Sequence, residues 1–141
     1  MPLSHEEREL FLSEPHIGAL SVEGDPGRAP LTVPVWYLYE PGADLRVLTG
    51  ADSRKARLIR AAGRFSLLAE RVRPTVRYVS VEGTVVESRA GTDDDLRQFA
   101  TRYLPAEKVA NYVEFASQDH GPTVLFRLRP DHWFSSDLGP L

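Results

Sequence analysis

The chain has 141 residues, of which 42% are hydrophobic and 26% are charged, a composition that is ordinary for a folded domain and argues against disorder. Its 17 basic and 20 acidic residues give a net charge of −3, which argues against a general nucleic-acid binder. The sequence contains no cysteine, which excludes disulfides, thiolate metal sites and cysteine nucleophiles.

The length predicts a single domain over residues 1–141. No apolar run approaches the ~18 residues that a membrane span needs. The first ten residues carry Glu6, Glu7 and Glu9 where a signal peptide would need basic and then apolar side chains. We therefore expect a cytoplasmic protein that has neither a membrane nor a nucleic acid as a partner.

The N-terminal half predicts a short helix followed by strands. Ser4 and Glu7 have the spacing of a capping box, and the helix that they begin should end before Pro15. Residues 17–22 and 31–39 are predicted strands, separated by a Gly-Asp-Pro-Gly turn at 24–27. The turn at 40–44 predicts a second hairpin, in which residues 45–49 return as the third strand.

The pattern then changes to a helical period. Asp52 or Ser53 is the expected N-cap of a helix that Gly63 ends. Strands are predicted over 65–70 and 78–86, a helix after Thr92, a further helix after Pro105, and a last strand over 123–134 followed by a loop. Strands joined mostly by hairpins, with helices inserted, favour a mainly β fold, a small antiparallel barrel with α additions.

The usual catalytic and metal-binding patterns do not occur in the sequence. His5, His16, His120 and His132 have no helical ligand spacing, and there is no nucleophile elbow and no glycine-rich phosphate loop. The three aspartates at 93–95 are explained by the helix dipole, because acidic side chains stabilise a first turn. The sequence therefore predicts no metal site and no catalytic dyad of its own.

An anion site is indicated where a predicted strand ends and a helix begins. Ser53 and the first N–H groups of the helix offer hydrogen bonds, Arg54 and Lys55 add positive charge, and Thr49 adds a hydroxyl. Basic residues at a helix N-terminus oppose the helix dipole, so a helix start that merely faces solvent explains Arg54 and Lys55 less well. From the residues alone, a phosphate site and a solvated helix start are equally supported.

The segments Ser53-Arg54-Lys55-Ala56, Arg64-Phe65-Ser66-Leu67 and Arg77-Tyr78-Val79-Ser80-Val81-Glu82-Gly83 resemble the pyridoxamine 5'-phosphate oxidase-like family of flavoproteins and their deazaflavin-dependent relatives. The resemblance covers residues 4–134 and implies a six- to seven-stranded antiparallel split β-barrel. It also implies a homodimer that binds FMN in the groove between its subunits and acts on a small-molecule substrate.

The family pattern carries over to particular residues of this chain. Arg54 and Lys55 match its phosphate-binding pair, with Ser53 beside them, and Leu48 and Thr49 match the strand end that approaches the cofactor. The strand Val33, Pro34, Val35 and Trp36 resembles the one that passes the edge of the isoalloxazine ring, and Tyr78 falls where flavin-binding members often have a glutamine.

The resemblance leaves several alternatives open. The cofactor is either FMN or a deazaflavin coenzyme, whose longer phosphodiester tail Arg57 and Arg60 would follow, unless they are simply solvated. The aromatic residues would either wall a planar ring or pack in the barrel; they are Trp36, Tyr37, Tyr39, Trp133 and Phe134. The chain could also be a non-catalytic cofactor-binding module, or a haem binder with His16 or His132 as ligand. Residues 91–121 would be a lid on the site or a cover on the barrel.

Overall fold

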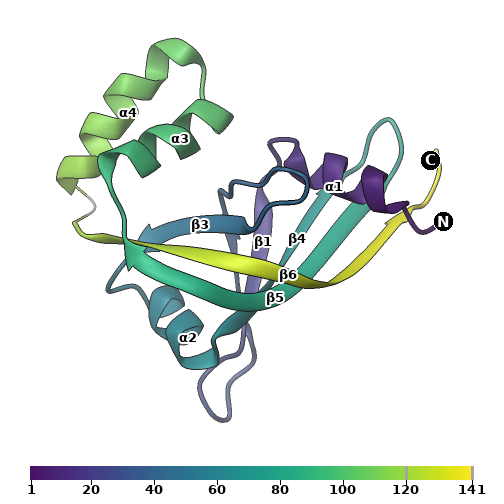
Figure 1. Cartoon of the computed structure of the whole chain (residues 1–141), viewed down its shortest axis with the longest axis horizontal. Helices are drawn as coiled ribbons and strands as arrows, with labels where there is room; N and C mark the ends of the chain where they lie inside the picture. The colour runs from purple at the N-terminus through teal and green to yellow at the C-terminus, as the bar shows by residue number, and fades with distance from the viewer. Residues whose placement is uncertain (120, 141) are drawn as a thin grey trace.

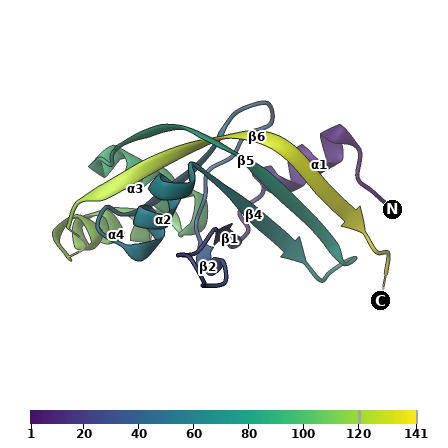
Figure 2. The ribbon, with the colours of Figure 1, turned by 90° about the horizontal axis from the view of Figure 1, so that it is seen from below.

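A computed structural model describes residues 1–119 and 121–140, with helices and strands in the order α1 (His5–Ser13), β1 (Gly18–Val22), β2 (Leu31–Val35), β3 (Leu45–Gly50), α2 (Arg54–Ala62), β4 (Arg64–Arg71), β5 (Arg77–Ala90), α3 (Asp93–Tyr103), α4 (Ala106–Asp119) and β6 (Thr123–Asp137). The six strands form one antiparallel sheet in the order β2-β1-β4-β5-β6-β3. The sheet curls strongly, with α3 and α4 at one end and both chain termini at the other (Figure 1; Figure 2). The predicted mainly β split barrel with helical additions is confirmed.

Local signals in the sequence place the helix ends. Ser4 and Glu7 form the predicted capping box of α1, and Thr92 and Asp95 form one at the start of α3. Ser53 caps α2, and Gly63 ends it in the left-handed conformation at φ 69°, which a residue with a side chain rarely adopts. These ends are encoded within a few residues, which explains why the sequence predicted them.

The core fills the inside of the curled sheet. Alternate residues of β1, β3 and β5 point inward, as in Leu20, Val47 and Val81, and α1 adds Phe11 and Leu12 from the side. A smaller cluster, built around Leu96, Ala100, Val109, Val113 and Ala116, joins α3 to α4. The helical hairpin therefore has apolar packing of its own next to the sheet.

The predicted second hairpin is wrong. β3 pairs along its length with β6, and residues 31–39 contact it through a single bridge between Leu38 and Arg46. β2 ends at Val35 because the chain then turns inward: Tyr37 is buried and its hydroxyl donates to the carbonyl oxygen of Leu12 at 2.7 Å. Tyr39 is also buried, so this segment serves the core and not a ladder.

β5 and β6 are longer than predicted and form the longest ladder of the sheet. Their ladder runs from Arg77, which pairs with Asp137, to Ala90, which pairs with Val124, with irregularities at Gly83 and after Val85. The predicted loop after residue 134 is therefore strand as far as Asp137. The residues at this end are polar and half-buried, so a search for alternating apolar residues does not find the strand there.

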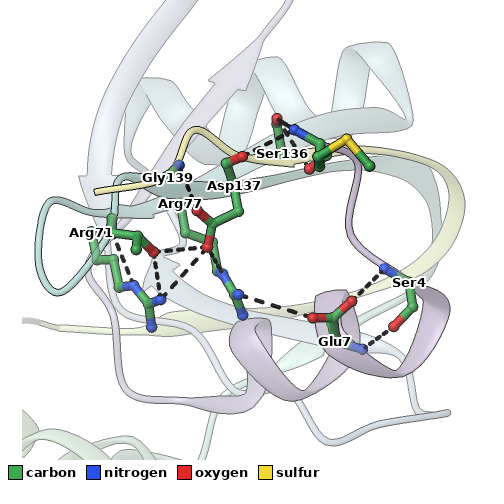
Figure 3. A network of polar contacts seen from close by, with 9 residues as sticks. Ser4, Glu7, Arg71, Arg77, Ser136, Asp137 and Gly139 are labelled. Atoms are coloured by element: carbon green, nitrogen blue, oxygen red, sulfur yellow. Dashed lines mark hydrogen bonds and ion pairs between the residues drawn. The ribbon is translucent and has the colours of Figure 1, made fainter. Parts of the chain in front are cut away.

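Polar contacts join the two chain termini (Figure 3). The N-terminal ammonium of Met1 donates to the carbonyl oxygen of Asp137 at 3.0 Å, and the Asp137 carboxylate accepts from Thr75, Arg77 and Gly139. The hydrogen bond from the Gly139 N–H, followed by those from Thr75 and Arg77, holds the pKa of Asp137 down to about 2. The beginning of the chain is thereby fixed to the end of β6.

Candidate functional site

A pocket lies where the sheet is split, between its two edge strands β2 and β3. Its cavity of about 230 Å³ is closed on a third side by the α3–α4 hairpin. Edge strands leave backbone N–H and C=O groups without a neighbouring strand, so the pocket walls offer hydrogen bonds to a ligand. The lining residues are Pro34, Val35, Trp36, Leu48, Thr49, Gly50, Lys55, Leu96, Phe99, Tyr112 and Thr123.

The N-terminus of α2 lies at one end of this pocket. The Ser53 hydroxyl accepts from the backbone N–H of Ala56 at 3.1 Å and donates to the carbonyl oxygen of Gly50 at 2.8 Å. The Ser53 hydroxyl therefore makes its hydrogen bonds within the turn and is not free to donate to an anion. In the part of the chain that the structure describes, the backbone N–H groups of Arg54 and Lys55 have no hydrogen-bond partner.

Lys55 brings a positive charge into the pocket. Its side chain is half-buried, and burial lowers the pKa of the ammonium below the ordinary value of 10.5. Across residues 1–119 and 121–140 no carboxylate or hydrogen-bond acceptor is paired with it. A partly desolvated ammonium beside two unused N–H groups favours an anion at this position.

The helical hairpin α3–α4 supplies a wall that sequence reasoning missed. Leu96, Phe99 and Tyr112 line the pocket, and the Trp36 ring is stacked on Tyr103 and tilted against Tyr112, at centroid distances of 4.9 and 5.4 Å. The sequence predicted a helix after Thr92 without saying what that helix would meet. Of the two alternatives for this segment, a lid on the site or a cover on the barrel, the first is nearer, because residues of both α3 and α4 line the pocket.

The structure brings together most of the predicted site residues: Pro34, Val35, Trp36, Leu48, Thr49 and Lys55 all line the pocket. Ser53 and Arg54 adjoin it at the start of α2, and Arg54 is exposed. Val33 points to a different depression, on the β1 side of β2.

Tyr78 lies apart from this group. It is near the start of β5, paired with Ser136 across the ladder, and its ring lies 5.9 Å from that of Phe134. Phe134 is 70% exposed, so this end of the sheet carries an uncovered aromatic pair. Within one chain, Tyr78 does not line the pocket that contains Lys55.

The open questions about the arginines and aromatic residues receive definite answers. Arg57 forms a bidentate pair with Asp25 at 2.9 and 3.1 Å, and Arg60 donates to the carbonyl oxygen of Ala51 at 2.8 Å. Tyr37 and Tyr39 are core residues, and Trp133 packs against Tyr39. Of the five aromatic residues considered, Trp36 alone lines the pocket.

The histidines do not form a site in the described ranges. His16 stacks on Phe11, its Nε2 lies 3.0 Å from the Phe11 carbonyl oxygen, and burial lowers its pKa. His132 is exposed and faces Glu82 across the ladder, and His120 lies outside the described residues. Among the described residues, no three His, Cys, Asp or Glu side chains gather as a metal site would require, and no helix is long and apolar enough to cross a membrane.

Comparisons with known proteins agree with this geometry. The structure resembles a conserved hypothetical protein from Mycobacterium tuberculosis (24% identity, 96% of this chain and 85% of that chain, TM-score 0.68). It also resembles an F420 reductase (21% identity, 95% and 98%, TM-score 0.67) and an FAD-binding protein from Mesorhizobium loti (20% identity, 97% and 95%, TM-score 0.64). No curated protein sequence matches the chain. The model of the pyridoxamine 5'-phosphate oxidase family matches residues 4–137, and the chain therefore belongs to that family.

Proposed function

We propose that the protein is a flavin-dependent oxidoreductase that binds FMN in the pocket between β2 and β3. The observation that carries this proposal is the half-buried Lys55 ammonium beside the unpartnered N–H groups of Arg54 and Lys55. A phosphate monoester needs this combination of donors, helix dipole and positive charge. When bound, FMN supplies the hydride and electron transfer, so the chain needs no acid–base dyad of its own.

In this proposal, different residues of the pocket contact different parts of the cofactor. Lys55, Arg54 and the N-terminus of α2 hold the phosphate, and Thr49 and Thr123 lie on the neighbouring wall. The backbone from Pro34 and Val35 of β2 to the following Trp36 runs beside the ring system. Leu96, Phe99 and Tyr112 exclude water from the third side, which strengthens every polar contact within.

The working unit in this proposal is a homodimer. One chain offers a cavity of about 230 Å³, whereas complete sites for molecules of cofactor size measure about 300–1,000 Å³. The exposed Phe134 and its neighbour Tyr78 lie on a sheet surface that a second copy would cover. In such a dimer Tyr78 belongs to the surface that completes the partner's pocket, and the substrate, a small molecule, enters between the subunits.

A deazaflavin coenzyme is the second candidate cofactor. The likeness to an F420 reductase favours it, and so does the exposed side chain of Arg54 at the start of α2. Arg54 has no hydrogen-bond or ion-pair partner across the described ranges, so it is available to the further anionic groups of a longer tail.

The test is a titration of the purified protein with FMN and with the deazaflavin coenzyme, each followed by fluorescence quenching. We expect saturable micromolar binding of one of them, weakened by about 1.5–3 kcal/mol in Lys55→Ala, the scale of a charged hydrogen bond. Arg64→Ala, which removes an exposed charge from the start of β4, should bind as the wild type does. Equal affinity in folded Lys55→Ala would contradict the phosphate assignment.

Turnover separates the enzyme from a module that merely binds its cofactor. Reduction of a panel of small acceptors by the loaded protein supports the oxidoreductase, and stoichiometric binding without turnover supports the module. If neither cofactor binds, a Soret band on addition of haem, lost in His132→Ala, would favour the haem alternative.

A further inference from the structure

A second cavity, of about 440 Å³, lies on the other side of α3, between that helix and the segment that joins β2 to β3. Leu96 and Phe99 of α3 face the first pocket, whereas Arg97 and Gln98 face the second cavity. Its volume falls within the range of about 300–1,000 Å³ that small-molecule sites occupy. The residues that line it have no part in the function proposed above.

Arg46, on the β3 wall of this cavity, lacks a counter-charge. It lies directly opposite Arg127 in the ladder between β3 and β6, an arrangement that like charges make unfavourable. Arg127 is compensated, because it pairs with Asp44 at 2.6 Å and Glu87 at 3.3 Å. Arg46 reaches the neutral Oε1 of Gln98 at 3.3 Å, and no carboxylate in the described part of the chain pairs with it.

A second arginine faces the cavity from α3. Arg97 is exposed, and it has no hydrogen-bond or ion-pair partner among residues 1–119 and 121–140. Asp94 also lines the cavity, but its carboxylate accepts from the Gln98 amide at 2.9 Å, which turns the amide oxygen toward Arg46. Arg102 is spent on the carbonyl oxygens of Ser13 and Glu14, each at 2.7 Å. Arg46 and Arg97 are thus the cations available to a ligand.

The rest of the lining is suited to an apolar body. Leu38 and Tyr39 are buried residues that form the side of the cavity nearest the sheet, and Thr101 adds a hydroxyl from α3. Glu40 is exposed, and water screens its charge as it screens that of Arg97. An apolar surface with convergent donors is typical of sites for small organic molecules.

We propose that this cavity binds a small organic carboxylate, held between Arg46 and Arg97 with its apolar body against Leu38 and Tyr39. The carboxylate accepts charge-assisted hydrogen bonds from both guanidinium groups and supplies the counter-charge that Arg46 lacks. The site is separate from the cofactor pocket and does not depend on which cofactor that pocket takes.

The test uses benzoate as the probe and benzamide as its uncharged counterpart, each titrated calorimetrically into the full chain. We expect saturable binding of benzoate, with benzamide at least about tenfold weaker. Arg46→Gln and Arg97→Gln should each weaken benzoate by about tenfold or more, the effect of losing one charged hydrogen bond. Arg97 is exposed on a helix, so Arg97→Gln remains a fair test even if Arg46→Gln unfolds the protein.

Two controls separate this site from general electrostatics and from the first pocket. Arg64→Gln makes the same change in net charge at an exposed position on β4 and should leave benzoate binding unchanged. Lys55→Gln should also leave it unchanged. The proposal is overturned by an absence of saturable benzoate binding, by wild-type affinity in Arg97→Gln, or by a loss that follows Lys55 instead of the two arginines.

Discussion

Tyr103 of α3 stacks against Trp36 at a centroid distance of 4.9 Å, with an angle of 13° between the ring planes. The Tyr103 hydroxyl also bonds to the backbone of Tyr37, the residue that follows Trp36. The hydroxyl accepts from the Tyr37 N–H at 3.1 Å and donates to the His16 carbonyl oxygen at 2.8 Å. The Tyr103 side chain thus connects the helical hairpin to the segment that follows β2 and to the loop that precedes β1.

Removing this hydroxyl should loosen the attachment. We expect Tyr103→Phe to lower the free energy of unfolding by about 1–3 kcal/mol, because it leaves a buried N–H of Tyr37 without its acceptor. Denaturant unfolding measures the change. Tyr112→Phe is the matched control, since the Tyr112 hydroxyl has no hydrogen-bond partner among the described residues, and it should change stability little. Equal losses in the two variants would contradict the role given to Tyr103.

Gly83 of β5 lies close to the backbone of β6. A Cβ atom there would overlap the carbonyl oxygen of Arg129, which is backbone and cannot rotate away. We expect Gly83→Ala to destabilise the protein by about 1–3 kcal/mol, the usual cost of forcing extra atoms into a packed interior. In Gly50→Ala the nearest such contact is 3.9 Å, so its thermal midpoint should stay at or above that of the wild type.

The lowered pKa of the Asp137 carboxylate predicts an acid-sensitive contribution to stability. Because the pKa of Asp137 is about 2 in the folded protein against an ordinary 3.8, the unfolded chain binds more protons between these values. The contribution is complete above pH 3.8 and is lost as the pH falls through 2. Urea unfolding at pH 5, 3 and 2 should show a steeper decline in wild type than in Asp137→Asn. Parallel declines would contradict this assignment.

Lys55 predicts the pH dependence of cofactor binding. Burial lowers its pKa below 10.5, so the ammonium to which we assign the phosphate loses its proton at a lower pH than an exposed lysine does. The dissociation constant for FMN should therefore rise as the pH climbs through that lowered pKa. In Lys55→Arg the cation persists at every accessible pH, and binding should stay level. The same rise in both proteins would mean that another group is responsible.

Much of the fold could be predicted because its signals are local. Ser4, Ser53 and Gly63 determine helix ends through contacts within a few residues, and the turn after β1 does the same for the first hairpin. The strand that pairs with β3 is β6, which lies far from it in the sequence. Apolar alternation in residues 45–49 fits any neighbouring strand, and chain proximity pointed to β2, whereas the burial of Tyr37 and Tyr39 drew the intervening segment into the core.

The pocket was predictable in part for the same reason. Thr49 and Lys55 adjoin a strand-to-helix junction that the sequence displays, and the family resemblance added Pro34 to Trp36. Tyr112 could not be found in this way. The sequence shows that α4 has an apolar face, but it does not show that this face lies against the pocket. Tyr78 does not line this pocket within one chain, so the role that the resemblance implies for it stays a prediction.

The α3–α4 hairpin leaves and rejoins the sheet at two residues that pair with each other, Ala90 of β5 and Val124 of β6. A segment whose two ends are neighbours can change in length or sequence without shifting the register of the strands that flank it. One wall of each cavity therefore belongs to a single insert, while the end of the first pocket at Lys55 is encoded elsewhere in the chain. This architecture allows ligand preference to diverge between relatives by replacing one insert, with the barrel left as it is.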